Sequence, residues 1–128
     1  MDRVLLDTQI VYLAYRGEVQ RFSAAVRDLL GNPDTVRLIS VVSIIEIAVK
    51  HSIGKLDMDQ DALQDAIRDL RLTEIPFESA HAFAMFSLPL HHRDPFDRMI
   101  LATAMAEKLP IVTGDRIFRR YSGVKITW

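Results

Sequence analysis

Short apolar runs alternate with longer stretches of helical periodicity along the chain. The runs at residues 4–6, 36–42 and 110–113 are rich in aliphatic side chains, as is typical of strands buried in a sheet. Residues 72–75 and 124–127 are two further strand candidates. Strands that alternate with helices usually form parallel sheets. The pattern therefore predicts an α/β fold with a central, mainly parallel β-sheet flanked by α-helices.

Capping residues, breakers and the spacing of apolar side chains place the expected helices between these runs. Apolar residues recur three and four positions apart, as on one buried helix face. No repeat, low-complexity segment or linker divides the sequence, so we expect a single domain over residues 1–128. The expected helices cover residues 9–15, 18–30, 43–54, 59–70, 78–86 and 94–108, with one helical turn near Phe118.

The composition excludes several kinds of chemistry. The chain has 49% hydrophobic and 26% charged residues, which fits a folded globule rather than a disordered chain. It has no cysteine, so disulfides, zinc–thiolate sites, iron–sulfur clusters and thiol nucleophiles are excluded. The apolar run near the N-terminus is too short for a signal peptide or a membrane span. We expect a cytoplasmic protein with no membrane partner.

The charge balance limits how the chain could bind a nucleic acid. Its net charge is −1, so any contact with phosphates must come from a local basic patch. Arg98 is one candidate for holding a phosphate, with a carboxylate partner or an exposed helix position as alternatives. The other candidates follow Asp115 in a stretch without any acid, where a solvated helix face is an equally good interpretation; they are Arg116, Arg119 and Arg120.

Acidic side chains follow the predicted strands. Ligands of open α/β sheets bind outside the carboxyl ends of the strands, so residues at these junctions are informative. Asp7 directly follows the first strand, and Asp115 follows the run at 110–113. Glu46 lies in the helix after the second strand, and Asp97 lies in the first turn of the helix that begins at 94.

Each acid also has a local structural explanation. Polar residues at helix starts accept hydrogen bonds from free backbone N–H groups, and acids there interact well with the helix dipole. The local assignments are Asp7 or Thr8 as an N-cap, Ser43 and Glu46 as a capping box, Asp94 and Asp97 at the start of a helix, and Asp115 as a turn residue.

Taken together, the four acids indicate a metal site. Carboxylates a few ångströms apart repel each other, and a divalent cation relieves that repulsion. Carboxylate oxygens suit Mg²⁺ or Mn²⁺ rather than zinc or copper. Such an ion activates a water near neutral pH and stabilises charge on a phosphoryl oxygen. The set of acids therefore predicts hydrolysis of a phosphodiester.

Four blocks that carry these acids resemble the PIN domain and, more closely, the VapC-type toxins of type II toxin–antitoxin systems. They are residues 5–8 (LLDT), 43–48 (SIIEIA), 94–104 (DPFDRMILATA) and 112–118 (VTGDRIF), in order and at fitting distances over nearly the whole chain. The resemblance implies an endoribonuclease that depends on Mg²⁺, with Mn²⁺ as a substitute. It also implies homodimers and inhibition by an antitoxin. The implied metal-binding acids are Asp7, Glu46, Asp97 and Asp115.

Other residues near these blocks receive supporting roles. Asp94 is interpreted as a cap or as an outer residue of the site, and Thr8 and Thr113 as hydroxyls that support the acids. Gln9 departs from the family pattern, which often has histidine or asparagine there. That departure concerns the surroundings of Asp7 and not the acid itself.

The histidines and one lysine near the acids have ordinary explanations. His91 and His92 are interpreted as loop residues, with RNA contact or transition-metal ligation together with Asp94 as alternatives. Lys50 lies four residues after Glu46, so an ion pair along the helix, with a stabilisation of about 0.3–0.5 kcal/mol, is preferred to a phosphate contact.

Three other functions compete with the nuclease. An aspartate-based phosphotransferase would use Asp7 but needs a second acid two residues on, where Gln9 stands. A receiver domain would need an acid pair after the first strand, which the sequence lacks. A catalytically silent RNA- or protein-binding module of the same fold would not need all four acids. The nuclease interpretation accounts for more of the sequence than these alternatives.

Overall fold

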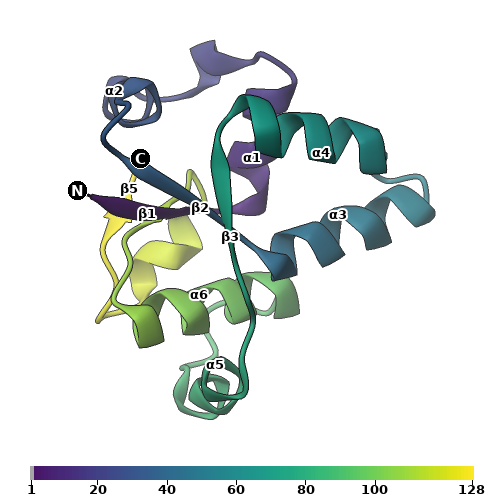
Figure 1. Ribbon diagram of the computed structural model, residues 1–128. Helices are drawn as coiled ribbons and strands as arrows, with labels where there is room; N and C mark the ends of the chain where they lie inside the picture. The colour runs from purple at the N-terminus through teal and green to yellow at the C-terminus, as the bar shows by residue number, and fades with distance from the viewer. Residues whose placement is uncertain (1) are drawn as a thin grey trace.

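A five-stranded parallel sheet forms the centre of the protein in the computed structural model, which describes residues 2–128 (Figure 1). Met1, which the predicted domain includes, lies outside the described part. The strand order is β3-β2-β1-β4-β5, and every neighbouring pair is parallel. This confirms the predicted α/β class. The strands are β1 (Arg3–Leu6), β2 (Val36–Ser40), β3 (Leu72–Ile75), β4 (Ile111–Val112) and β5 (Ile126–Thr127).

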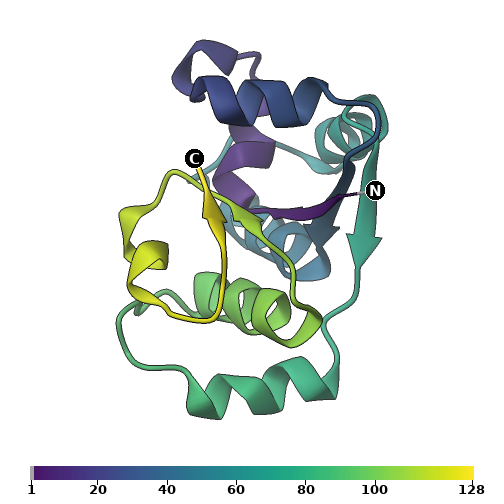
Figure 2. The ribbon, with the colours of Figure 1, turned by 90° about the vertical axis from the view of Figure 1, so that its left-hand side faces the viewer.

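Helices cover both faces of this sheet. Figures 1 and 2 show α1, α2 and α4 on one side of the sheet and α6 on the other, with α5 packed on the outer side of α6. None of the helices within residues 2–128 is both long and apolar enough to cross a lipid bilayer. The helices are α1 (Thr8–Tyr15), α2 (Ala24–Gly31), α3 (Val41–Ser52), α4 (Gln60–Asp69), α5 (Ser79–Ala84) and α6 (Pro95–Glu107), with 3₁₀ turns η1 (Val19–Arg21), η2 (Met85–Ser87) and η3 (Arg116–Arg120).

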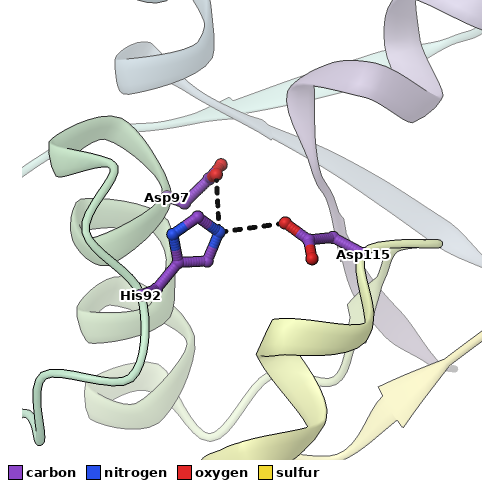
Figure 3. Close-up of side chains that lie close together, drawn as sticks. All are labelled: His92, Asp97 and Asp115. Carbon is purple, nitrogen blue, oxygen red and sulfur yellow. Dashed lines mark hydrogen bonds and ion pairs between the residues drawn. The ribbon is translucent and has the colours of Figure 1, made fainter.

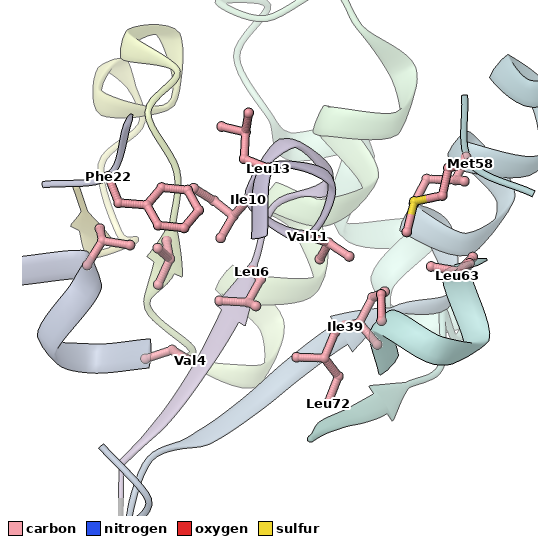
Figure 4. Packing of buried hydrophobic residues seen from close by; sticks show 14 residues of the cluster. Val4, Leu6, Ile10, Val11, Leu13, Phe22, Ile39, Met58, Leu63 and Leu72 are labelled. Atoms are coloured by element: carbon pink, nitrogen blue, oxygen red, sulfur yellow. The ribbon is translucent and has the colours of Figure 1, made fainter. Parts of the chain in front are cut away.

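The alternation of side chains along the strands separates two hydrophobic cores. Val4 and Leu6 of β1 point into the core that contains α1, α2 and α4 (Figure 4). Leu5, between them, points into the core formed with α6 and η3. Successive strand residues face opposite sides of a sheet, so a strand buried on both faces must be apolar throughout. This explains the continuous apolar run that predicted β1.

The predicted helix over residues 18–30 is wrong, because the segment is broken in the middle. A 3₁₀ turn covers Val19–Arg21, and Phe22 is extended, with ψ 147°. The Ser23 hydroxyl then accepts a hydrogen bond from the Val26 N–H at 3.2 Å and starts α2. Phe22 is buried and meets Trp128 edge-on, so tertiary packing of this ring overrides the helical periodicity.

The junction between β2 and α3 lies earlier than the sequence predicted. The strand ends at Ser40, whose hydroxyl accepts from the Val42 N–H at 3.0 Å, and α3 begins at Val41. Ser43 is consequently inside the helix rather than its cap, and the predicted capping box of Ser43 and Glu46 is wrong. Valine favours strands, but a serine at the N-cap position decides the boundary.

Replacing Leu5 with alanine should unfold the protein more easily, because Leu5 is fully buried in a central strand. Leu5→Ala is expected to lower the free energy of unfolding by about 2–5 kcal/mol. Leu90→Ala is the matched control, since 67% of Leu90 is exposed, and it should change that free energy by less than about 0.5 kcal/mol. Urea unfolding followed by circular dichroism measures both values, and equal effects would contradict this description of the core.

Candidate active site

The four acids singled out in the sequence line one pocket at the carboxyl edge of the sheet. The pocket has a volume of about 410 Å³. Asp7 follows β1, Asp115 follows the neighbouring strand β4, Glu46 lies on α3 and Asp97 lies in the first turn of α6. Asp94 also lines the pocket, as the N-cap of α6. The fold therefore brings together side chains that are far apart in the sequence.

Asp7 and Asp115 each use their two carboxylate oxygens for different tasks. Asp7 Oδ1 accepts from the Ile10 N–H at 2.9 Å and caps α1, while Oδ2 accepts from the Thr113 hydroxyl. Asp115 Oδ1 accepts from the Ile117 N–H at 3.0 Å and caps η3, while Oδ2 contacts His92. Capping and site formation are thus compatible for these two acids. The cap fixes the carboxylate so that its other oxygen is available for the site.

Glu46 is buried and has a partner for each oxygen. The Thr8 hydroxyl donates to Oε1 at 2.6 Å, and Thr8 is also 2.8 Å from the Ser43 hydroxyl. Lys50 donates to Oε2 at 2.7 Å, which confirms the predicted ion pair along α3. The hydrogen bond to Glu46 raises the pKa of the Lys50 amine and keeps it charged. The sequence placed Thr8 and Thr113 beside the acids, and both contact one in the structure.

His92 belongs to the site, although the sequence interpretation favoured an ordinary loop residue over a functional one. The interpretation as an ordinary loop residue is wrong, because the side chain is buried and points between two acids (Figure 3). Its Nε2 lies 2.9 Å from Asp97 Oδ2 and 2.9 Å from Asp115 Oδ2. His91, in contrast, is exposed and meets the Tyr121 ring edge-on. The sequence signal for this role was the position of His92, two residues before the Asp94 cap and five before Asp97.

Burial and crowding disfavour the ionised form of two of the acids. Burial, with the charges of Asp115 and Glu46 adding to it, raises the pKa of Asp7 from 3.8 to about 6. Burial and the nearby Asp94 carboxylate raise the pKa of Asp97 from 3.8 to about 7. Ionised acids in this pocket carry an excess of negative charge, which a bound cation would offset. The set of oxygen donors therefore fits a hard divalent ion such as Mg²⁺ or Mn²⁺.

The arginines proposed for RNA contact lie around the pocket rather than in its lining. The Arg98 guanidinium donates to the carbonyls of Pro89 and His92 at 3.1 and 3.3 Å, so it holds the loop that precedes α6. Three exposed arginines lie on η3, directly after Asp115; they are Arg116, Arg119 and Arg120. Two other cations line the pocket: Lys50, for which the sequence favoured the ion pair, and Arg21, which it did not single out.

Trp128 forms part of the pocket wall, and its position depends on the absence of a side chain at Gly114. Its ring lies on Gly114, where an added Cβ would meet indole atoms at 3.0 Å. A side chain at 114 would push the indole away or shift the turn that carries Asp115. The contact joins the end of the chain to the site, and its long sequence separation hides it from local sequence patterns.

Comparison with known proteins identifies a family and a fold. The family model of the PIN domain matches residues 4–124. No curated protein matches the sequence. Among solved structures, the chain is similar to VapBC2 from Rickettsia felis bound to a promoter DNA fragment, with 19% identity, a TM-score of 0.73 and coverage of 98% of this chain and 97% of that one.

Two further structures show the same likeness. DNA-bound VapBC from Salmonella typhimurium has 20% identity and a TM-score of 0.72, with 99% of this chain and 98% of that chain covered. VapBC-5 from Mycobacterium tuberculosis, described as a member of the VapBC family of toxin–antitoxin systems, has 20% identity and a TM-score of 0.61, with 98% of both chains covered. At these identities the likeness shows a shared fold.

Removing the charge of Asp97 should stabilise the metal-free protein at high pH. Its raised pKa means that the folded state binds this proton more tightly than the unfolded state, so stability falls as pH rises from about 4 to about 7. We expect Asp97→Asn to raise the free energy of unfolding at pH 8 by about 1–2 kcal/mol in the presence of chelator. The gain should shrink at pH 5, where the native Asp97 is already protonated.

Urea unfolding of the parent and the variant at both pH values measures this difference. Asp57→Asn is the control, because Asp57 is exposed and does not line the pocket. A variant that is less stable than the parent at pH 8 would contradict the proposed crowding of negative charge.

Proposed function

The chain belongs to the PIN domain family, and from this premise we propose that it is a Mg²⁺-dependent endoribonuclease and the toxin of a type II toxin–antitoxin pair. The observation that carries the proposal is the convergence of four carboxylates, from two strand ends and two helices, in one pocket. We place its activity in the cytoplasm, where it would meet RNA.

The proposed metal ligands are the four acids that line the pocket. Their oxygens suit Mg²⁺, with Mn²⁺ as a substitute, and the pocket leaves room for the waters that Mg²⁺ retains. A bound divalent ion would supply charge stabilisation at a phosphoryl oxygen and a more acidic water for in-line attack on phosphorus. The residues assigned to this role are Asp7, Glu46, Asp97 and Asp115.

The other pocket residues orient the acids and receive the substrate. The Thr113 hydroxyl holds one oxygen of Asp7, and the Thr8 hydroxyl holds one oxygen of Glu46. Lys50 and Arg21 provide positive charge at the pocket, which can offset the negative charge of an entering phosphate. The exposed arginines of η3 directly follow Asp115 in the chain, and the RNA backbone would continue over them.

Exposed apolar side chains support a protein partner. Phe83 and Phe86, which are 70% and 88% exposed, stack on each other at the end of α5. Ile45 and Val49 on α3 and Ile53 at its C-cap are exposed at positions four residues apart. Apolar patches of this kind commonly mark protein interfaces. We propose a homodimer and an inhibiting antitoxin as the partners, in line with the toxin–antitoxin complexes that share this fold.

Removal of any proposed ligand should abolish RNA cleavage. Asp7→Asn, Glu46→Gln, Asp97→Asn and Asp115→Asn are each expected to lower the cleavage rate at least about 100-fold, since even partners of metal ligands contribute 10- to 100-fold. Chelation of the metal should do the same, and Mg²⁺ or Mn²⁺ should restore the activity. Cleavage of an end-labelled RNA measures the rate.

Asp57→Asn, an exposed acid outside the pocket, should cleave at the parent rate. If all four pocket variants also cut RNA at the parent rate, the site assignment is wrong. A parent protein that binds Mg²⁺ but cleaves no RNA would support the catalytically silent module instead.

Expression of the chain in bacteria should arrest growth if it is a toxin. The Asp97→Asn variant at the same protein level should let cells grow normally, because the arrest depends on the active site. Growth curves with matched immunoblots provide the comparison. Equal growth of cells that express the parent and the variant would argue against the toxin role while leaving the nuclease assignment open to the cleavage assay.

A further inference from the structure

The position of His92 assigns it a role that the four acids alone do not explain. We propose that His92 is a positioning residue: its Nε2–H donates to Asp115 Oδ2 while Nε2 also lies 2.9 Å from Asp97 Oδ2, so the fixed ring sets the separation of the two acids. The inference rests on the proposed function, because it takes these two acids as metal ligands. It adds a ring N–H donor to the hydroxyl donors that hold Asp7 and Glu46.

Hydrogen bonds identify which ring nitrogen of His92 carries the proton. The backbone N–H of Asp94 points at Nδ1, with the two nitrogens 3.2 Å apart. A backbone N–H can only donate, so Nδ1 must accept and carry no proton. The single ring proton is then on Nε2, which faces the two carboxylates. The surroundings thus place the ring's N–H donor on Nε2, directed into the site.

Packing fixes the ring as well as its tautomer. The ring lies edge-on to Phe118, with centroids 5.4 Å apart and an interplanar angle of 78°. The His92 backbone N–H donates to the Tyr121 hydroxyl at 2.8 Å, and its carbonyl accepts from Arg98 at 3.3 Å. Tyr121 in turn donates to the Pro89 carbonyl at 2.8 Å. The loop before α6 is therefore tied to η3 and to α6 itself.

The two acids that His92 joins belong to separate parts of the chain. Asp97 is carried by α6 and Asp115 by the turn after β4. The three potential ligand atoms, one from each side chain, lie within 4.8 Å of one another (Figure 3). Two carboxylates at this separation repel each other, and a donor between them lowers the repulsion. Donors behind metal ligands also orient them and commonly contribute 10- to 100-fold to metal affinity.

The same geometry argues against His92 as a metal ligand. A ligating nitrogen needs a free lone pair in the ring plane, and in this tautomer Nε2 carries a proton at that position instead. Moving the proton to Nδ1 would break the hydrogen bond from the Asp94 N–H. The two roles make different demands on a substitute: a positioning donor can be replaced by an amide N–H, whereas an imidazole ligand cannot.

Metal titration of the folded protein separates these roles. The probes are Mn²⁺ and Ni²⁺ alone, in isothermal titration calorimetry of the parent, His92→Ala, His92→Gln and the control His51→Ala. His51 is exposed on α3 and does not line the pocket. Imidazole ligands favour Ni²⁺ over Mn²⁺, so a ligand role would appear as a selective loss of Ni²⁺ affinity. Circular dichroism confirms that each variant is folded.

We expect His92→Ala to weaken the binding of both metals by about 10- to 100-fold. His92→Gln should restore most of that loss, and His51→Ala should bind like the parent. The proposal is overturned if His92→Ala binds Mn²⁺ as tightly as the parent. It is also overturned if both His92 variants lose Ni²⁺ affinity selectively, since His92 would then be a ligand.

A second measurement uses the metal-free protein and so does not depend on nuclease activity. Long-range ¹H–¹⁵N correlation spectra distinguish the two neutral histidine tautomers. We expect the Nε2–H form for His92 at pH 8, and a change in its ¹⁵Nε2 signal in Asp115→Asn. An Nδ1–H form would overturn the positioning role. If the parent has the expected tautomer but cleaves no RNA, the proposed function fails and the assignment of His92 stands.

Discussion

Repulsion among closely spaced carboxylates, two of them buried, is the constraint on which the rest of this site depends. A parallel sheet brings the ends of neighbouring strands to one edge, and here that edge collects acids from β1, β4, α3 and α6. Burial and mutual repulsion raise the pKa of Asp7 and Asp97 well above the usual range. A fold that keeps such groups together loses stability at neutral pH unless a cation offsets their charge.

The local structure holds these acids in place through ordinary backbone interactions. Asp7 and Asp115 each bind an N–H group at a helix or 3₁₀ start with one oxygen and direct the other toward the site. Thr113 and His92 contact those second oxygens. The helix start therefore fixes the carboxylate before any ligand arrives, so little conformational entropy remains to be lost on binding. Asp7 and Asp115 therefore serve both the local structure and the site.

Local rules predicted the parts of the structure that local interactions determine. The buried strand β1 and the cap of α6 at Asp94 follow from apolar runs and capping chemistry, and the acids follow from their places near strand ends. The break at Phe22 and the role of His92 depend on contacts with distant residues. Loop histidines are common, and nothing in the order of residues shows that Asp97 and Asp115 would meet on one ring nitrogen. Such contacts require the folded chain.

The most direct test of the account is a crystal structure of the protein soaked in Mn²⁺, with anomalous scattering used to locate the metal. We predict an anomalous peak in the pocket, within coordination distance of oxygens from the proposed ligands Asp7, Glu46, Asp97 and Asp115, with the His92 ring still between Asp97 and Asp115. A pocket without an anomalous peak, or metal bound only elsewhere on the surface, would contradict it.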